Sequence, residues 1–146
     1  MSHRLIQRLA RLRQEFEAAG AVLRLANRIW PSISMETEVS GTALAAIRVT
    51  AANLEATYLI RLFAEFEALL RDAYPSIRPG TTVPARSAAL IDQIGARLRI
   101  PTAVRADVHL VRSYRNGLAH GRQGARPVSF SDALSSLNRY LAWLPG

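Results

Sequence analysis

The chain has 146 residues, enough for one hydrophobic core and too few for two comfortable ones, and its 49% apolar content excludes a disordered chain. It has no cysteine, which excludes disulfides, thiolate metal sites and cysteine nucleophiles and fits a reducing compartment. The formal net charge is +8, and every one of the 19 Lys and Arg residues is Arg, which suits a polyanionic partner, although biased codon use would explain the missing Lys equally well.

The first predicted element is a long helix over residues 5–30. Its apolar residues recur at spacings of four and three, which places them on one face of a helix: Leu5, Leu9, Leu12, Phe16, Ala19, Leu23, Ala26 and Trp30. We expect Pro31 to end this helix because a proline disfavours the helical conformation in the residue before it. The apolar seam is expected to pack either within the bundle or against a second chain.

Residues 31–41 contain turn formers without a helical period and predict a connector. A second long helix, roughly 50 Å in length, is predicted from Thr42 until Tyr74 and Pro75 stop the pattern. Residues 75–86 carry three prolines and a glycine and predict a loop.

Three shorter helices follow. The first spans residues 87–98, the second begins at Pro101 and Thr102, and the third runs from Ser129, which with Asp132 nearly matches a capping box, to about Leu144. No segment predicts a strand. The sequence therefore predicts an all-α, up-and-down bundle of about five helices in a single domain over residues 1–146, with a long N-terminal helix over 1–30 and the remaining bundle over 42–144.

No apolar run approaches the roughly 18 residues that a membrane span needs. The N-terminus also lacks the uninterrupted apolar core of a secretory signal. We therefore expect a cytoplasmic protein without a membrane partner.

One basic residue of the fourth helix, Arg115, falls on an apolar stripe. On a helical wheel of about 100° per residue, five apolar residues lie within about 60° of it: Val104, Val108, Val111, Leu118 and Ala119. Because an unpaired buried charge is very costly, this guanidinium must pair with a carboxylate inside the bundle or lie at a cleft or subunit interface where a phosphate supplies the charge. The neighbouring arc is polar and holds His109, Arg112, Ser113, Asn116 and His120.

The segment Arg115-Asn116-Gly117-Leu118-Ala119-His120 resembles the R-x4-6-H motif of the HEPN superfamily of helical ribonucleases. The resemblance covers most of residues 42–144 and leaves the first helix unexplained. It implies a homodimer in which two motifs face each other across a cleft and cut RNA without a metal ion or other cofactor. Arg115 would hold the scissile phosphate, His120 would transfer protons, and Asn116 would orient one of them.

The resemblance also implies a toxin or defence component, with an antitoxin or an associated defence protein as a partner. One HEPN subgroup has a Tyr two residues after the His, where this chain has Arg122. That difference puts regulation by a nucleotidyltransferase that modifies such a Tyr in doubt.

The chemistry fits these few residue types. RNA supplies its own nucleophile, the 2′-hydroxyl, so the protein needs only proton transfer and charge stabilisation, which His and Arg provide near neutral pH. On a continuous helix His109 lies roughly 16 Å from His120 and cannot be its partner. Twofold symmetry would supply a second His120, which is an independent reason to expect a dimer.

Three flanking residues, Arg112, Arg122 and Arg126, are predicted to follow the RNA backbone, with solvated loop charge as the equal alternative. The acids of the second helix either pair with Arg115 or form surface ion pairs: Glu65, Glu67 and Asp72. The alternative to an active nuclease is a catalytically inactive HEPN-like module that dimerises or binds RNA or protein. A further alternative is an unrelated helical bundle, in which Arg115 is a structural ion pair and His120 a helix C-terminal residue favoured by the dipole.

Overall fold

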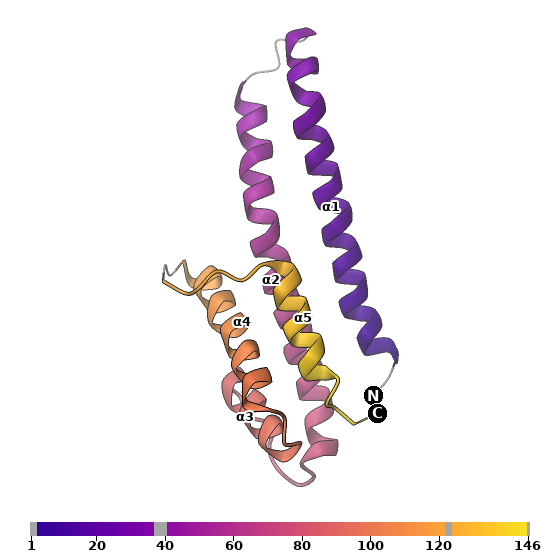
Figure 1. Cartoon of the computed structure of the whole chain (residues 1–146), viewed down its shortest axis with the longest axis vertical. Helices are drawn as coiled ribbons and strands as arrows, with labels where there is room; N and C mark the ends of the chain where they lie inside the picture. The colour runs from indigo at the N-terminus through magenta and orange to yellow at the C-terminus, as the bar shows by residue number, and fades with distance from the viewer. Residues whose placement is uncertain (1–2, 37–40, 122–123, 146) are drawn as a thin grey trace.

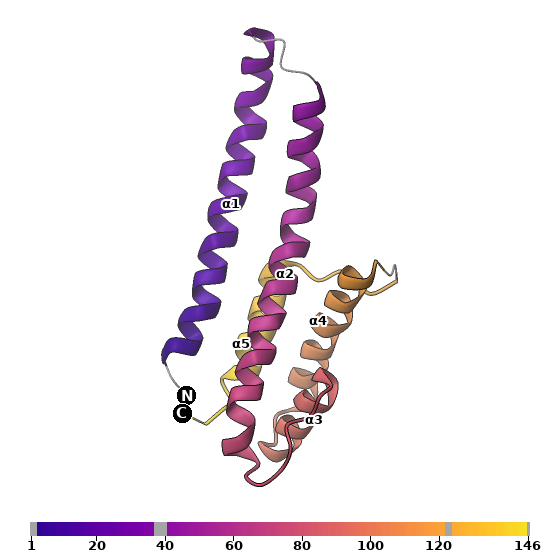
Figure 2. The ribbon, with the colours of Figure 1, turned by 180° about the vertical axis from the view of Figure 1, so that it is seen from behind.

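The computed structural model describes residues 3–36, 41–121 and 124–145. Within these ranges it contains five helices and no strand, which confirms the predicted all-α bundle: α1 (His3–Glu36), α2 (Gly41–Ile77), α3 (Ser87–Arg97), α4 (Thr102–His120) and α5 (Phe130–Leu141). α1 and α2 form a long antiparallel hairpin (Figures 1 and 2). α4 and α5 lie along the lower part of α2, with short α3 beside α4, so the upper part of the hairpin projects beyond the bundle.

Two predicted boundaries are wrong because a proline does not end either long helix. α1 continues past Pro31 to Glu36, so residues 31–36 are helical rather than part of a connector, and residues 37–40 lie outside the described residues. α2 continues past Pro75 to Ile77. A proline removes one backbone donor and disfavours the residue before it, but a helix can pass through with a kink when packing compensates. In α2 the compensation is the burial of Ile77 in the core.

The core is centred on α2. Its residues Leu59, Leu62, Phe63, Phe66 and Leu69 are 0% exposed. α1 adds its lower part to this core, where Leu9 and Leu12 are buried and Phe16 stacks on Phe130 of α5 with ring centroids 4.2 Å apart. The lower part of the apolar seam of α1, at Leu9, Leu12 and Phe16, therefore packs within the bundle.

The projecting part of the hairpin leaves apolar side chains in solvent. Val22, Leu25 and Ile29 of α1 are 65%, 52% and 41% exposed, and Val49 of α2 is 60% exposed. Val22 and Leu25 each precede a half-buried seam residue, Leu23 or Ala26, by one position, and Ile29 lies on the same side of the helix as they do.

The start of α5 is fixed by two contacts. Ser129 caps the helix, since its hydroxyl accepts a hydrogen bond from the Asp132 amide at 3.1 Å, as the sequence predicted. The carboxylate of Glu55 on α2 accepts a hydrogen bond from the Phe130 amide at 2.7 Å. The helix itself ends at Leu141, and a following turn still buries Leu144, which explains why its apolar period extends to that residue.

α4 carries the residues singled out from the sequence. It packs against α2, α3 and α5, and Val108 and Val111 are buried. It ends at Gly121, whose positive φ of 62° forms a left-handed cap. None of the described helices is long and apolar enough to cross a membrane.

Candidate functional site

Arg115 lies half-buried on the core-facing side of α4, and no acid among the described residues neutralises it. Its guanidinium carbon is 5.5 Å from the ring centroid of Phe63 on α2, and its Nη1 donates a hydrogen bond to Oδ1 of Asn116 at 3.0 Å. The Nε–H group is shielded from solvent and has no acceptor among the described residues. No carboxylate of the described part of the chain forms an ion pair with it, so the charge is held in place but not neutralised.

The acids of α2 have other partners. Glu65 pairs with Arg8 at 3.6 Å, and Glu67 pairs with Arg71 at 2.6 Å and accepts a hydrogen bond from Ser87 at 3.0 Å. These two residues are therefore structural ion pairs, the alternative to pairing with Arg115. Asp72 is exposed.

His120 is the last residue of α4 and is exposed. The helix continues through it, so Arg115 and His120 lie about 140° apart around the helix axis and about 7.5 Å apart along it. Asn116 lies between them and contacts Arg115. The structure thus brings Arg115 and Asn116 together, whereas His120 of the same chain points in another direction.

Of the three predicted RNA-binding arginines, the two that the structure describes lie apart from each other. Arg112 is half-buried on the side of α4 that carries Asn116. Arg126, in the loop before α5, lines a cavity of about 220 Å³ with Asp107 and Leu110, which lie on the other side of α4. Arg122 lies outside the described residues.

Two residues that we did not predict belong to the Arg112 side of α4. Asp92 of α3 contacts Nε2 of His109 at 2.9 Å. The side chain of Arg105 packs directly on Gly95 of α3, where its Cδ leaves no room for a Cβ atom. Arg105 also donates a hydrogen bond to the Thr102 hydroxyl at 3.3 Å. The spacing of Arg105, His109, Arg112 and Asn116 indicates one helix face and could have revealed this cluster from the sequence.

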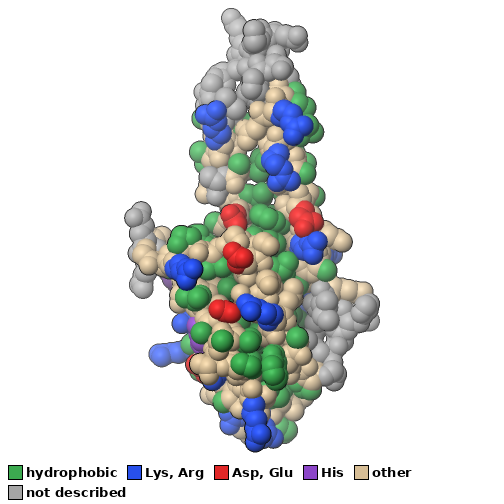
Figure 3. All heavy atoms as spheres, viewed as in Figure 1, with side chains coloured by type: hydrophobic (Ala, Val, Ile, Leu, Met, Phe, Trp, Pro, Cys, Tyr) green, Lys and Arg blue, Asp and Glu red, His purple; other side chains and the backbone are tan. Residues whose placement is uncertain are grey.

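The positive charge is concentrated in the second half of the chain. Residues 78–146 hold ten of the 19 Arg but only three of the 11 acidic residues. Two of these acids are engaged, because Asp92 contacts His109 and Asp107 pairs with Arg139 at 2.9 Å. Basic and histidine side chains accordingly gather along the margin formed by α3 and α4 (Figure 3).

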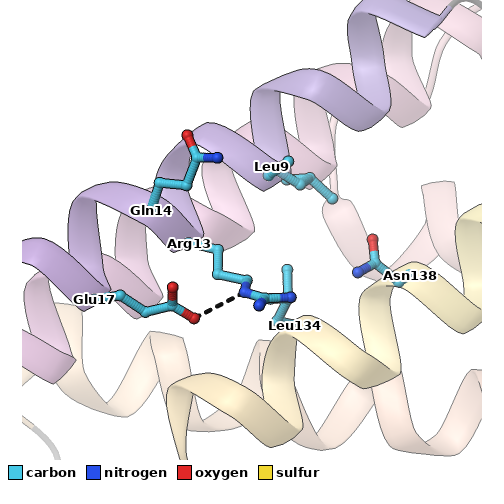
Figure 4. A pocket seen from close by; sticks show the side chains of 7 residues that line it. Leu9, Arg13, Gln14, Glu17, Leu134 and Asn138 are labelled. Atoms are coloured by element: carbon cyan, nitrogen blue, oxygen red, sulfur yellow. Dashed lines mark hydrogen bonds and ion pairs between the residues drawn. The ribbon is translucent and has the colours of Figure 1, made fainter.

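A larger cavity, of about 360 Å³, lies between α1 and α5 (Figure 4). Its wall includes an ion pair of Arg13 and Glu17 at 2.8 Å, and Gln14 and Asn138 add amide groups. None of the predicted site residues lines this cavity. The described residues also contain no group of three or more His, Asp and Glu that could hold a metal ion.

The chain matches no known protein family, no curated protein and no solved structure. The function is therefore inferred from the chemistry of α4.

Proposed function

We propose that this protein is a HEPN-like, homodimeric, metal-independent endoribonuclease that uses Arg115 and His120 of each chain. The observation that carries the proposal is the state of Arg115. A guanidinium on an apolar helix face, with no carboxylate partner in the described part of the chain and a hydrogen bond only to the neutral amide of Asn116 there, retains a charge that an anion can pair with. A phosphodiester supplies both the charge and the acceptor oxygens.

The reaction needs few groups. The 2′-hydroxyl attacks phosphorus and loses its proton to a base, the P–O5′ bond breaks, and an acid protonates the leaving O5′, which yields a 2′,3′-cyclic phosphate. Arg115 would stabilise the charge on the phosphoryl oxygens. Asn116 would fix the guanidinium plane through its hydrogen bond to Nη1.

The divergence of Arg115 and His120 on one helix supports a composite site. Because they point about 140° apart, one chain alone does not direct both groups at a single phosphate. In a twofold dimer the imidazole of His120 from each chain would approach the shared site, one as base and the other as acid. A toxic or defensive role, a cytoplasmic location and an antitoxin or defence partner belong to the same proposal and depend on the family resemblance alone.

One observation favours a second candidate, a catalytically inactive RNA-binding module. His120 is exposed, and no described residue holds its imidazole in a fixed orientation. By contrast, His109 is held by Asp92. An unoriented imidazole is a poor acid or base unless a partner chain fixes it.

The test is cleavage of end-labelled RNA in EDTA by the wild type, Arg115→Ala and His120→Ala, with Arg24→Ala as the control because Arg24 is an exposed arginine on the projecting part of α1. We expect cyclic phosphate products from the wild type and the control, and a loss of about 10²-fold or more in the two site variants. RNA with a 2′-deoxy scissile nucleotide should remain intact. Wild-type protein that binds RNA without cutting it would establish the inactive module, and equal cleavage by all four proteins would refute the site.

Light scattering at micromolar concentration tests the dimer. A monomer that still cleaves RNA would remove the composite site, because only one His120 would then be available.

A further inference from the structure

One side of α4 carries a continuous polar edge. Arg105, His109, Arg112 and Asn116 are spaced by four, three and four residues, so they fall within an arc of about 60° around the helix. We call these four residues the basic edge. It lies beside α3, and it ends next to Arg115, because Asn116 contacts the guanidinium of that residue.

Two long side chains of the basic edge, Arg105 and His109, are held in place. Arg105 packs over Gly95 and bonds to Thr102, and His109 is held by Asp92. Fixed groups lose less conformational entropy when they bind a ligand than flexible surface side chains do.

The charges of Arg105 and Arg112 also have no counter-ion in the part of the chain that the structure describes. Neither forms an ion pair with a carboxylate of the described residues, and the Nε–H groups of Arg105 and Arg112 are shielded from solvent without an acceptor there. The arginines near the base of the α1–α2 hairpin differ, because each pairs with a glutamate: Arg8, Arg11, Arg13, Arg61 and Arg71. Other described arginines without an ion pair, such as Arg24 and Arg28, are exposed to solvent, whereas those of α4 have shielded Nε–H groups.

We propose that the basic edge binds the sugar–phosphate backbone of single-stranded RNA and leads it to Arg115; this inference rests on the proposed function and names the substrate path of the same site. Arg105 and Arg112 are about 10.5 Å apart along the axis. A nucleic acid strand carries one phosphate per nucleotide, so a span of that length covers more than one phosphate. The edge therefore matches a polyanion better than a single phosphate ion.

The chemistry of the edge also argues against a membrane surface. A helix that binds lipid headgroups borders its basic face with apolar residues that enter the bilayer. The exposed large apolar residue of the described part of α4, Leu110, lies on the other side of the helix, in the cavity that Arg126 lines. Guanidinium and amide groups without such a border fit phosphates and 2′-hydroxyls.

The test measures binding without cleavage. A fluorescein-labelled uridine oligonucleotide with 2′-fluoro sugars has no nucleophile, so its fluorescence anisotropy reports affinity alone. The proteins are the wild type, the double variant Arg105→Gln/Arg112→Gln, and the control Arg24→Gln/Arg28→Gln, which removes the same charge from exposed arginines of α1. Arg112→Gln alone serves as a second variant, since it leaves the contacts of Arg105 with Gly95 and Thr102 intact.

We expect the edge variant to lose about tenfold or more in affinity at low salt, and the slope of log K against log salt to fall by about 1.4, as for two lost phosphate contacts on a single strand. The control should lose far less, and Arg112→Gln should account for about half of the change in slope. Equal losses in the two double variants, or none in either, would overturn the inference. So would binding to phosphatidylserine vesicles, rather than to RNA, that depends on Arg105 and Arg112.

The two proposals fail in different ways. If the edge variant loses binding but the wild type never cuts RNA with free 2′-hydroxyls, RNA binding by the basic edge is supported and the nuclease activity is refuted. If the wild type cuts RNA and the edge variant binds the 2′-fluoro oligonucleotide as the wild type does, the nuclease stands and the basic edge falls.

Discussion

Replacing Arg115 by Leu separates a functional arginine from a structural one. A structural cation stabilises the fold, so its removal lowers the free energy of unfolding. An arginine that binds an anionic substrate from an apolar helix face lowers the free energy of unfolding of the free protein. An apolar replacement on the same face should therefore not destabilise the protein. Leu suits the position because Val108 and Val111 lie on the same stripe and are buried.

The magnitude follows from the contacts of Arg115. The substitution removes a hydrogen bond to Asn116, worth about 1 kcal/mol, and a cation–π contact with Phe63, worth about 0.5–1 kcal/mol at a partly exposed site. It also removes a shielded N–H group without an acceptor, which costs about 1–3 kcal/mol, and adds about 1 kcal/mol from half-burying a Leu side chain. We expect the variant to be more stable than the wild type by about 1 kcal/mol, or about 3–4 °C in Tm.

The assay is urea unfolding followed by far-UV circular dichroism at one protein concentration, since dimerisation would make stability depend on concentration. Arg71→Leu is the matched control. Arg71 is also half-buried, but it pairs with Glu67 and donates hydrogen bonds to the carbonyls of Pro84 and Ala85 at 2.7 and 2.8 Å. Its removal should destabilise the fold by about 2–4 kcal/mol. A loss of more than about 1 kcal/mol in Arg115→Leu would make Arg115 a structural residue and refute the reasoning.

Three further predictions concern stability. Tyr140→Phe removes a buried hydrogen bond to the Ile91 carbonyl at 2.6 Å and should lower the free energy of unfolding by about 1–2 kcal/mol in urea titrations; an unchanged midpoint would contradict it. Burial raises the pKa of Tyr140 above its ordinary value of 10.0. Because the unfolded chain ionises first, the contribution of neutral Tyr140 to the free energy of unfolding is complete below about pH 10 and declines above it. The wild type should therefore lose more stability than Tyr140→Phe between pH 9 and about 11. Ser129→Ala removes the capping hydrogen bond from the Asp132 amide and should lower the free energy of unfolding by about 1 kcal/mol in thermal unfolding. Ser129→Asn keeps a capping side chain and should retain most of that stability.

The fold could be predicted because helical periodicity reports directly on which face is buried. The seam of Leu9, Leu12 and Phe16 packs as its spacing predicted. The errors lie where local rules compete with packing. Pro75 disfavours a helix locally, but the burial of Ile77 two residues later extends α2 by another turn. Sequence spacing records the local preference and not the tertiary contact that outweighs it.

The candidate site could be predicted only within one helix. The wheel placed Arg115 on an apolar face and Asn116 beside it, and both placements hold. The pairing of Asp92 with His109 joins two helices, and the separation of Arg126 from Arg112 depends on the path of the loop before α5, so neither follows from spacing along one helix. Whether His120 meets an Arg115 across a dimer remains a prediction.

The distribution of unneutralised arginines is the strongest physical argument for a role of α4. A chain with 19 Arg and 11 acidic residues must leave several arginines without an acidic partner in any fold. The least costly place for them is open solvent, where Arg24 and Arg28 lie exposed. Among the described residues, however, three of the four shielded side-chain polar atoms without a partner are Nε atoms of α4: Arg105, Arg112 and Arg115. Each lowers the stability of the protein, and such costs concentrated on one helix are typical of residues kept for function rather than for stability. If Arg115→Leu raises stability and abolishes RNA binding or cleavage, the stability lost through Arg115 is linked to RNA binding. If it raises stability and leaves RNA binding and cleavage unchanged, RNA is not the ligand of α4.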